Sequence, residues 1–186
     1  QKAAVSSETR VTDAAQKEVE SKKRQLIGSL ICAVPLFYIA MGGMLGWPVP
    51  PQLSGMQNMM NLALTELLLC IPILFINRHY FIGGFRSLIH GAPNMDALIA
   101  LGSSASFAYS VVSLYQMANA FVVGDLTAVH AAMHGMYFES AGLILTLITL
   151  GKFFEARAKG RTTGAIEALM NLTPKTAVVE RDGKEE

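Results

Sequence analysis

Two carboxylates lie within long apolar stretches of the sequence, where a charged side chain is costly to bury. Glu139 stands near the start of one stretch and Glu66 lies inside another. Ionisable side chains in such stretches commonly mark ion pathways. The alternative for Glu139 is a charge favoured by the helix dipole, and we prefer a functional role. For Glu66 we prefer a structural role, because its sequence neighbours offer no second type of ligand.

Methionine supplies a second ligand chemistry, since the sequence contains ten of these residues. A thioether is a soft ligand that suits Cu(I), but methionine more often fills irregular gaps in packing. Packing is therefore our interpretation for each methionine taken singly. Met95 is the exception, because it follows Pro93-Asn94 directly after a short amphipathic segment. We interpret Met95 as a ligand at the point where an ion enters the membrane.

Histidines and cysteines give weaker signals. His130 and His134 are four residues apart with Met133 between them, which makes a candidate ligand cluster. Loop histidines are more often simply solvated, and we favour that interpretation. Cys32 and Cys70 are single thiols in apolar runs, which excludes a disulfide scaffold and a CxxC metal site. The sequence also lacks a phosphate-binding GxxxxGK[ST] loop, so nothing in it could hydrolyse ATP unaided.

The composition indicates the elements that must position these residues. Hydrophobic residues make up 52% of the 186 residues and charged residues only 16%, against about 25% charged in a typical globular chain. A net charge of +1 argues against a nucleic-acid binder that works through bulk charge. The hydrophobicity also excludes a mainly disordered chain. The sequence therefore predicts an all-α protein that crosses the membrane several times.

Four apolar segments are long enough to cross a hydrocarbon core of about 30 Å. The predicted spans are residues 26–46, 59–82, 97–123 and 128–154. A start of the fourth span at Met136 is the alternative. We favour a start near Ala128, because the preceding residues form an otherwise helix-compatible run.

The distribution of positive charge predicts the orientation. The fifteen Lys and Arg residues are confined to residues 1–25, 77–94 and 152–186, and the segments 47–58 and 124–135 contain none. Positively charged segments remain in the cytosol. Both termini are therefore expected to be cytosolic, in a multi-pass protein of the cell membrane. Residues 1–25 are predicted to form a cytosolic linker or leading helix.

Adjacent glycines predict a kink at the end of the second span. After Gly83-Gly84, the apolar side chains of residues 85–90 share one helical face, while Arg86 and His90 share the other. This pattern predicts a short platform helix, residues 83–90, on the cytosolic membrane surface. A plain helix end with a glycine cap is the alternative.

The last segment, 155–186, is predicted to leave the membrane and begin a cytosolic domain. Charged residues mark the exit of the fourth helix, and Thr173-Pro174 should end it. Residues 176–179 are typical of a strand, and Asp182-Gly183 predicts a hairpin turn. Because a lone hairpin is unstable, we expect this β unit to continue in a longer protein.

Several runs of residues resemble the heavy-metal-transporting P-type ATPases. Pro93–Gly102 looks like the opening of that family's third helix. Tyr137–Ser140 and Leu150–Arg161 resemble its fourth helix and the cytosolic extension of that helix. Gly83-Gly84 resembles the double-glycine kink of its docking platform, and Leu172–Ala177 resembles the start of its actuator domain. The copper(I)-exporting subgroup is the most similar.

This resemblance implies a role for each candidate residue. Met95 and Glu139 would ligate copper(I), or silver, where it enters from the cytosol. Gly83, Gly84 and Arg86 would form the platform on which a cytosolic copper chaperone or metal-binding domain docks. Asp125 is a weaker candidate for the exit-site acid.

The resemblance also implies parts that this sequence lacks. The family's Cys-Pro-Cys motif, its phosphorylated Asp and its Thr-Gly-Glu motif are absent. We therefore expect an N-terminal membrane fragment of a pump, with ATP and Mg²⁺ bound by the remaining domains of the parent protein. No nucleic-acid partner is expected, and membrane lipid surrounds the spans.

Two alternatives stay open. One is a zinc, cadmium or cobalt pump of the same superfamily, which the sequence beyond Glu186 would distinguish. The other is a non-enzymatic four-helix membrane protein that binds metal, against which the unfinished hairpin argues.

One geometric condition applies to the proposed pair of ligands. A helix from Glu139 to Lys152 spans roughly 20 Å, so Glu139 lies far from the cytosolic face if the fourth span begins at Met136. Met95 and Glu139 can share one ion only if the span begins earlier. Otherwise they bind the ion one after the other, as successive sites. We favour the earlier start.

Overall fold

The computed structural model describes residues 2–171, 180–181 and 184–185. Six α-helices dominate this part of the chain, together with two short 3₁₀ turns and two two-residue strands. The α-helices are α1 (Lys2–Leu45), α2 (Met59–Ile76), α3 (Arg78–Ile89), α4 (Met95–Val123), α5 (Leu126–His134) and α6 (Phe138–Asn171). The 3₁₀ turns are η1 (Pro51–Leu53) and η2 (Met56–Asn58), and the strands are β1 (Glu180–Arg181) and β2 (Lys184–Glu185).

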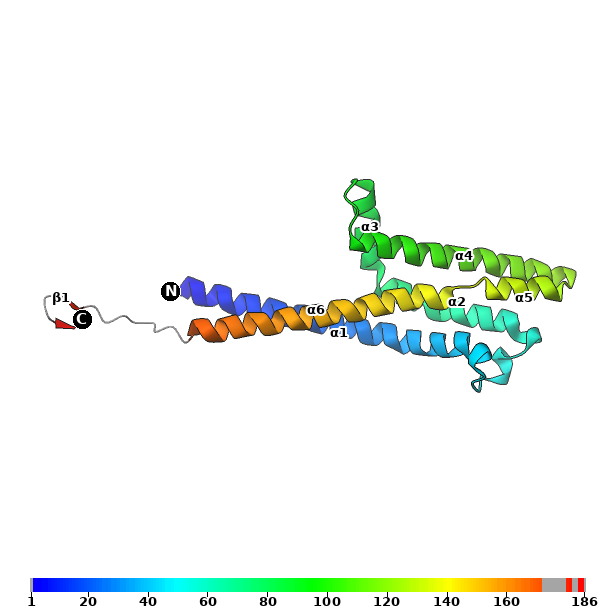
Figure 1. Cartoon of the computed structure of the whole chain (residues 1–186), viewed down its shortest axis with the longest axis horizontal. Helices are drawn as coiled ribbons and strands as arrows, with labels where there is room; N and C mark the ends of the chain where they lie inside the picture. Colours follow the sequence, from blue (N-terminus) through cyan, green and yellow to red (C-terminus); the bar gives the residue numbers. More distant parts are fainter. Residues whose placement is uncertain (1, 172–179, 182–183, 186) are drawn as a thin grey trace. The chain divides into compact units, whose positions relative to one another are not determined.

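The chain divides into two compact units. One comprises Lys23–Gly151, and the other comprises Gln1–Lys22 with Lys152–Glu186. The first unit holds most of α1, all of α2 to α5 and the first part of α6 (Figure 1).

Four segments are long and apolar enough to cross a membrane, as predicted from the sequence. They are Ala14–Leu45, Met56–Ile76, Met95–Val123 and Leu126–Gly160. Many large apolar side chains on these helices face outward; Ile31, Leu68 and Val122 are 69%, 67% and 86% exposed. Outward-facing apolar side chains suit a lipid environment, because lipid tails are as apolar as these side chains.

Small residues allow the spans to approach one another. A Cβ atom placed on Gly142 of α6 would lie 3.0 Å from Leu36 Cδ2 of α1 and 3.1 Å from Ile73 Cδ1 of α2. Leu36 and Ile73 are themselves buried. Close contact through small residues is a common means of packing helices in membranes.

The second helix is interrupted at Asn77, whereas the sequence analysis placed the kink at Gly83-Gly84. Helix α2 ends at Ile76, and α3 is continuous through both glycines. The side chain of Asn77 donates from Nδ2 to the carbonyl oxygen of Ile73 at 2.9 Å and to Ser29 Oγ of α1 at 2.8 Å. Its Oδ1 accepts a hydrogen bond from Thr149 Oγ1 of α6 at 2.7 Å. These partners satisfy the buried amide of Asn77, and Gln25 Nε2 donates to the carbonyl oxygen of Ile76 at 3.1 Å, a backbone group at the break.

Gly84 instead permits a close crossing between α3 and α4. A Cβ atom at Gly84 would collide with the carbonyl oxygen of Asp96 and would lie 2.8 Å from Ala100 Cβ. Helix α3 runs across the direction of α4 (Figure 1). Close packing, rather than bending, is the structural reason for a glycine at this position.

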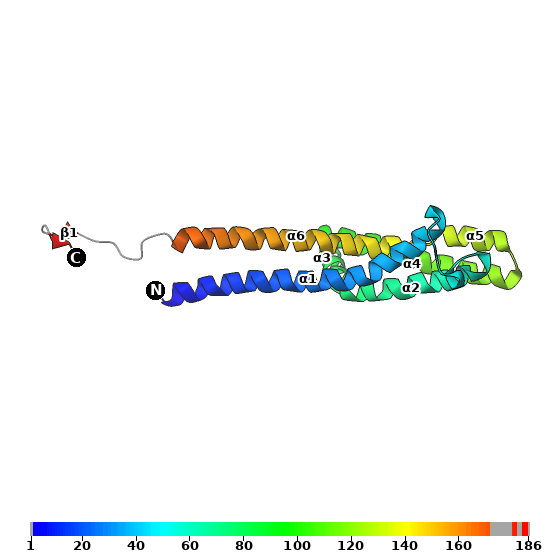
Figure 2. The same cartoon turned by 90° about the horizontal axis from the view of Figure 1, so that it is seen from below.

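The fourth span consists of two helices rather than one. Helix α4 ends at Val123 and is capped by Gly124, whose φ of +73° is left-handed, and α5 then folds back along α4 (Figures 1 and 2). Helix α5 ends at His134, and α6 begins at Phe138. The intervening turn is bound to α4, because Ser113 Oγ donates to the carbonyl oxygen of Gly135 at 3.2 Å and Tyr137 N donates to Ser110 Oγ at 2.7 Å.

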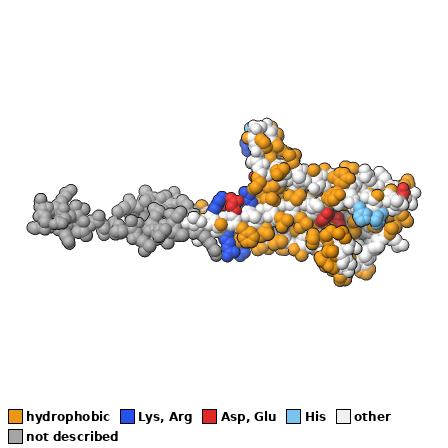
Figure 3. All heavy atoms as spheres, viewed as in Figure 1, with side chains coloured by type: hydrophobic (Ala, Val, Ile, Leu, Met, Phe, Trp, Pro, Cys, Tyr) orange, Lys and Arg blue, Asp and Glu red, His pale blue; other side chains and the backbone are white. Residues whose placement is uncertain are grey.

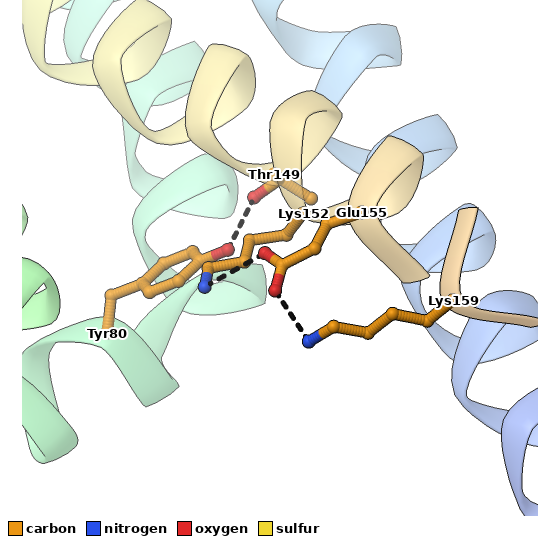
Figure 4. A network of polar contacts seen from close by, with 5 residues as sticks. All are labelled: Tyr80, Thr149, Lys152, Glu155 and Lys159. Carbon is orange, nitrogen blue, oxygen red and sulfur yellow. Dashed lines mark hydrogen bonds and ion pairs between the residues drawn. The ribbon is translucent and has the colours of Figure 1, made fainter. Parts of the chain in front are cut away.

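Charged side chains mark the part of α6 that belongs to the other unit. Glu155 pairs with Lys152 at 3.4 Å and with Lys159 at 2.7 Å (Figure 4). These contacts follow the i,i+3 and i,i+4 spacing of neighbours on an exposed helix surface. The strands β1 and β2 pair antiparallel, with Glu180 opposite Glu185. The predicted strand at residues 176–179 and the turn at residues 182–183 lie outside the described residues.

Candidate metal site

A cavity of about 650 Å³ lies between residues of α1, α2, α5 and α6, all within the Lys23–Gly151 unit. Its lining combines carboxylates, imidazoles and thioethers. These side chains are Glu66, Glu139, His130, His134, Met41, Met44, Met59, Met133 and Met136. The cavity thus gathers most of the ligand types that the sequence analysis considered separately.

The surface near α5 shows the same grouping. Acidic and histidine side chains adjoin one another among hydrophobic side chains, and the visible face of this part carries no Lys or Arg (Figure 3). An anionic group without a neighbouring cation favours the binding of a positively charged ion.

Glu139 is placed at the cavity by the start of α6. It is the second residue of that helix and is half-buried, and Ser140 Oγ donates to its Oε1 at 3.1 Å. The helix start is held against α4 by the hydrogen bond from Tyr137 N to Ser110 Oγ. The carboxylate therefore lies where the helix dipole stabilises negative charge, while one face of it remains open to the cavity.

Glu66 lines the same cavity from α2 and is only 2% exposed. The sequence analysis assigned Glu66 a structural role because no ligand stands near it in the sequence. Only the packing of α2 against α6 reveals a pair of carboxylates, which no local spacing could have indicated.

Met95 lies elsewhere, at the first residue of α4, and its side chain is 52% exposed. Asn94 caps this helix by accepting from Ala97 N at 3.0 Å, and Ser87 Oγ of α3 donates to the same Asn94 oxygen at 3.1 Å. Met95 is thereby held next to the end of α3.

The structure does not bring Met95 and Glu139 together. Glu139 follows Tyr137, which is bonded to Ser110. Ser110 is fifteen residues beyond Met95 on α4, or roughly 22 Å along the helix axis at 1.5 Å per residue. A single ion cannot contact both side chains across this distance, although a helical segment does precede Met136 as we favoured.

The other predicted residues occupy exposed or packing positions. Arg86 is exposed on α3, close to the glycine pair. Asp125 is exposed and serves as the N-cap of α5, where its Oδ1 accepts from Ala128 N at 3.0 Å. The Asp125 carboxylate thus has a structural role that the sequence analysis did not consider.

The chemistry available in the cavity is that of a mixed site. Thioethers and imidazoles bind soft and borderline ions such as copper, whereas carboxylates alone favour harder ions. Among the residues that the structure describes, no three His, Cys, Asp or Glu side chains lie close enough together to hold a metal ion. The cavity can therefore hold a soft ion only with thioether participation.

Known proteins similar to this chain are copper-transporting P-type ATPases. The chain is 35% identical over 178 residues to a probable copper-importing P-type ATPase of Enterococcus hirae, covering 95% of this chain. It is 36% identical over 174 residues to a copper-exporting P-type ATPase of Staphylococcus saprophyticus, covering 92% of this chain. A copper-exporting P-type ATPase of Bacillus subtilis is 41% identical over 119 residues, or 63% of this chain.

The chain belongs to the heavy-metal-transporting P-type ATPases. The resemblance proposed from the sequence is thereby confirmed. This P-type ATPase chain spans 22%, 20% and 14% of the lengths of those three relatives. No family model matches the chain, and no solved structure matches it.

Proposed function

We propose that this chain is the N-terminal membrane part of an ATP-driven pump that exports copper(I), or silver(I), from the cytosol. The observation that carries the proposal is the cavity, which is lined by Glu139 together with several methionine thioethers. Thioethers favour copper(I) over zinc or cobalt, and the three relatives compared above are copper-importing or copper-exporting P-type ATPases.

Met95 and Glu139 then act in succession. Met95 is half-exposed at the start of α4 and suits the first capture of an incoming ion. Glu139 lies about 20 Å further along and receives the ion later in its passage. A single thioether or a single carboxylate holds a soft ion weakly, and weak binding allows the ion to move on.

Helix α3 is the proposed docking platform for a copper chaperone or metal-binding domain. It crosses α4 closely at Gly84, with Gly83 beside it and Arg86 exposed. The bond from Ser87 to Asn94 connects this platform to Met95. A carrier that docks on α3 would therefore release its ion next to the first ligand.

The positive-inside pattern places both termini and the platform in the cytosol. Energy for transport would come from ATP and Mg²⁺ in other domains of the parent protein, through an aspartyl-phosphate. The predicted start of an actuator domain after α6 belongs to the same proposal.

The test uses the full-length pump with single substitutions. Met95→Ala and Glu139→Ala should each reduce copper-stimulated ATP hydrolysis by about tenfold, which is typical of a weakened metal site. Met56→Ala and Glu20→Gln are matched controls, because both residues are exposed and neither lines the cavity. Parent rates in both test variants would refute the assignment of these ligands.

Direction and ion are tested in inside-out vesicles with ATP and Mg²⁺ supplied in the outer medium, which contacts the cytosolic face of the pump. Export from the cytosol predicts accumulation of radioactive copper within these vesicles, with competition by silver(I). Stimulation by zinc instead would favour a divalent-metal pump.

A further inference from the structure

Helix α5 carries two imidazoles that no part of the proposed transport mechanism uses. His130 and His134 are separated by one helical turn, which places them on the same face. Their ring centroids are 4.5 Å apart, with the planes inclined at 66°. Both side chains are exposed, yet both also line the cavity that holds Glu66 and Glu139.

The position of this pair is fixed by the fold. Val129 and Ala132, on another face of α5, belong to the buried core. The helix is capped at its start by Asp125 and is tied to α4 at its end, where Ser113 donates to the Gly135 carbonyl oxygen. Because the helix is held at both ends, the backbone positions of the two histidines are fixed one turn apart, which lowers the cost of binding one ion with both rings.

The third ligand type lies between the two histidines. Met133 is half-buried and lines the same cavity. Two imidazole nitrogens and one thioether suit copper(I) and its chemical analogue silver(I), and they suit calcium or magnesium poorly. The Glu139 carboxyl group lines the same cavity, and a negative charge there favours a cation at this opening.

We propose that His130, His134 and Met133 form a soft-metal site at the opening of the cavity, distinct from the ligands Met95 and Glu139. The site binds copper(I) or silver(I) on the side where the chain carries no Lys or Arg. It rests on the proposed function only in the identity of the ion, because metal binding at these side chains requires neither ATP nor transport.

The experiment measures histidine modification in the full-length pump reconstituted in lipid nanodiscs without ATP. Diethylpyrocarbonate acylates accessible imidazoles, and mass spectrometry of peptides reports each histidine separately. Silver(I) should slow the modification of His130 and His134 while leaving that of His90 unchanged. His90 is the internal control, because it is exposed directly after α3 and does not line the cavity.

Variants test whether the three side chains act together. His130→Ala should raise the silver(I) concentration that protects His134 by about tenfold, and Met133→Leu should shift it in the same direction. Met56→Leu is the matched control for the loss of a thioether, since Met56 lies outside the cavity. Equal modification with and without silver(I), equal protection of all three histidines, or protection by zinc(II) alone would overturn the proposal. Normal protection together with unchanged transport in Met95→Ala and Glu139→Ala would support this site while refuting the transport ligands.

Discussion

At the scale of single residues, the buried Asn77 side chain joins α1 and α6 through hydrogen bonds. Its amide bonds Ser29 of α1 and Thr149 of α6, and all three side chains are fully buried. Thr149 also lies 3.5 Å from the hydroxyl of Tyr80 (Figure 4). In an apolar environment, removing the Asn77 amide takes a hydrogen-bond partner from both Ser29 and Thr149, and Thr149 keeps only the longer contact to Tyr80 within the described part of the chain.

Asn77→Ala should therefore lower the free energy of unfolding by about 1–3 kcal/mol. Thermal unfolding in detergent measures the change. Asn61→Ala is the matched control, because Asn61 is exposed and bonds only Asn58 at 3.4 Å through its side chain; its effect should stay within about 0.5 kcal/mol. Equal melting temperatures for the two variants would show that the buried network contributes little.

At the scale of elements, the crossing of α3 and α4 determines where the platform lies relative to Met95. The crossing is close because Gly84 has no Cβ atom to meet Asp96 and Ala100. Gly83 is less constrained, since a Cβ there would lie 3.6 Å from Asp96 Oδ2, an ordinary contact distance. The two adjacent glycines thus have different structural roles.

Gly84→Leu should displace α3 from α4 and weaken metal delivery. Overpacking should lower the free energy of unfolding by about 1–3 kcal/mol. Gly83→Ala should be tolerated, because its methyl group has room and alanine favours a helix. Thermal unfolding and chaperone-dependent copper transfer in the parent protein distinguish the variants. Identical behaviour of the two would contradict the close-crossing argument.

At the scale of the whole molecule, apolar surface and positive charge determine the predicted orientation of the chain in a membrane. The four spans expose apolar side chains along their length. The segments 47–58 and 124–135 carry no positive charge. That asymmetry predicts a membrane orientation with these segments outside.

Labelling of single cysteines tests this orientation in intact cells. With Cys32 and Cys70 replaced, Gln52→Cys and Asp125→Cys should react with a membrane-impermeant maleimide added outside. Lys23→Cys should react only after the cells are opened. External reagent that labels Lys23→Cys and spares the other two would reverse the topology.

The sequence by itself determined the membrane class, the number of spans and the family. These properties depend on the length of apolar runs and on local motifs, which can be seen without knowledge of packing. The candidate ligands Met95 and Glu139 were also identifiable from the sequence, although their separation along α4 was not.

Only the tertiary structure decided where the second helix breaks and which ligands share a cavity. The break at Asn77 depends on Ser29 and Thr149, which are 48 and 72 residues away in the sequence. Glu66 and the histidine pair likewise line one cavity with Glu139 only because the helices pack together. Such contacts join distant parts of the chain, and the local periodicity that identifies a span carries no information about which faces of the spans come together.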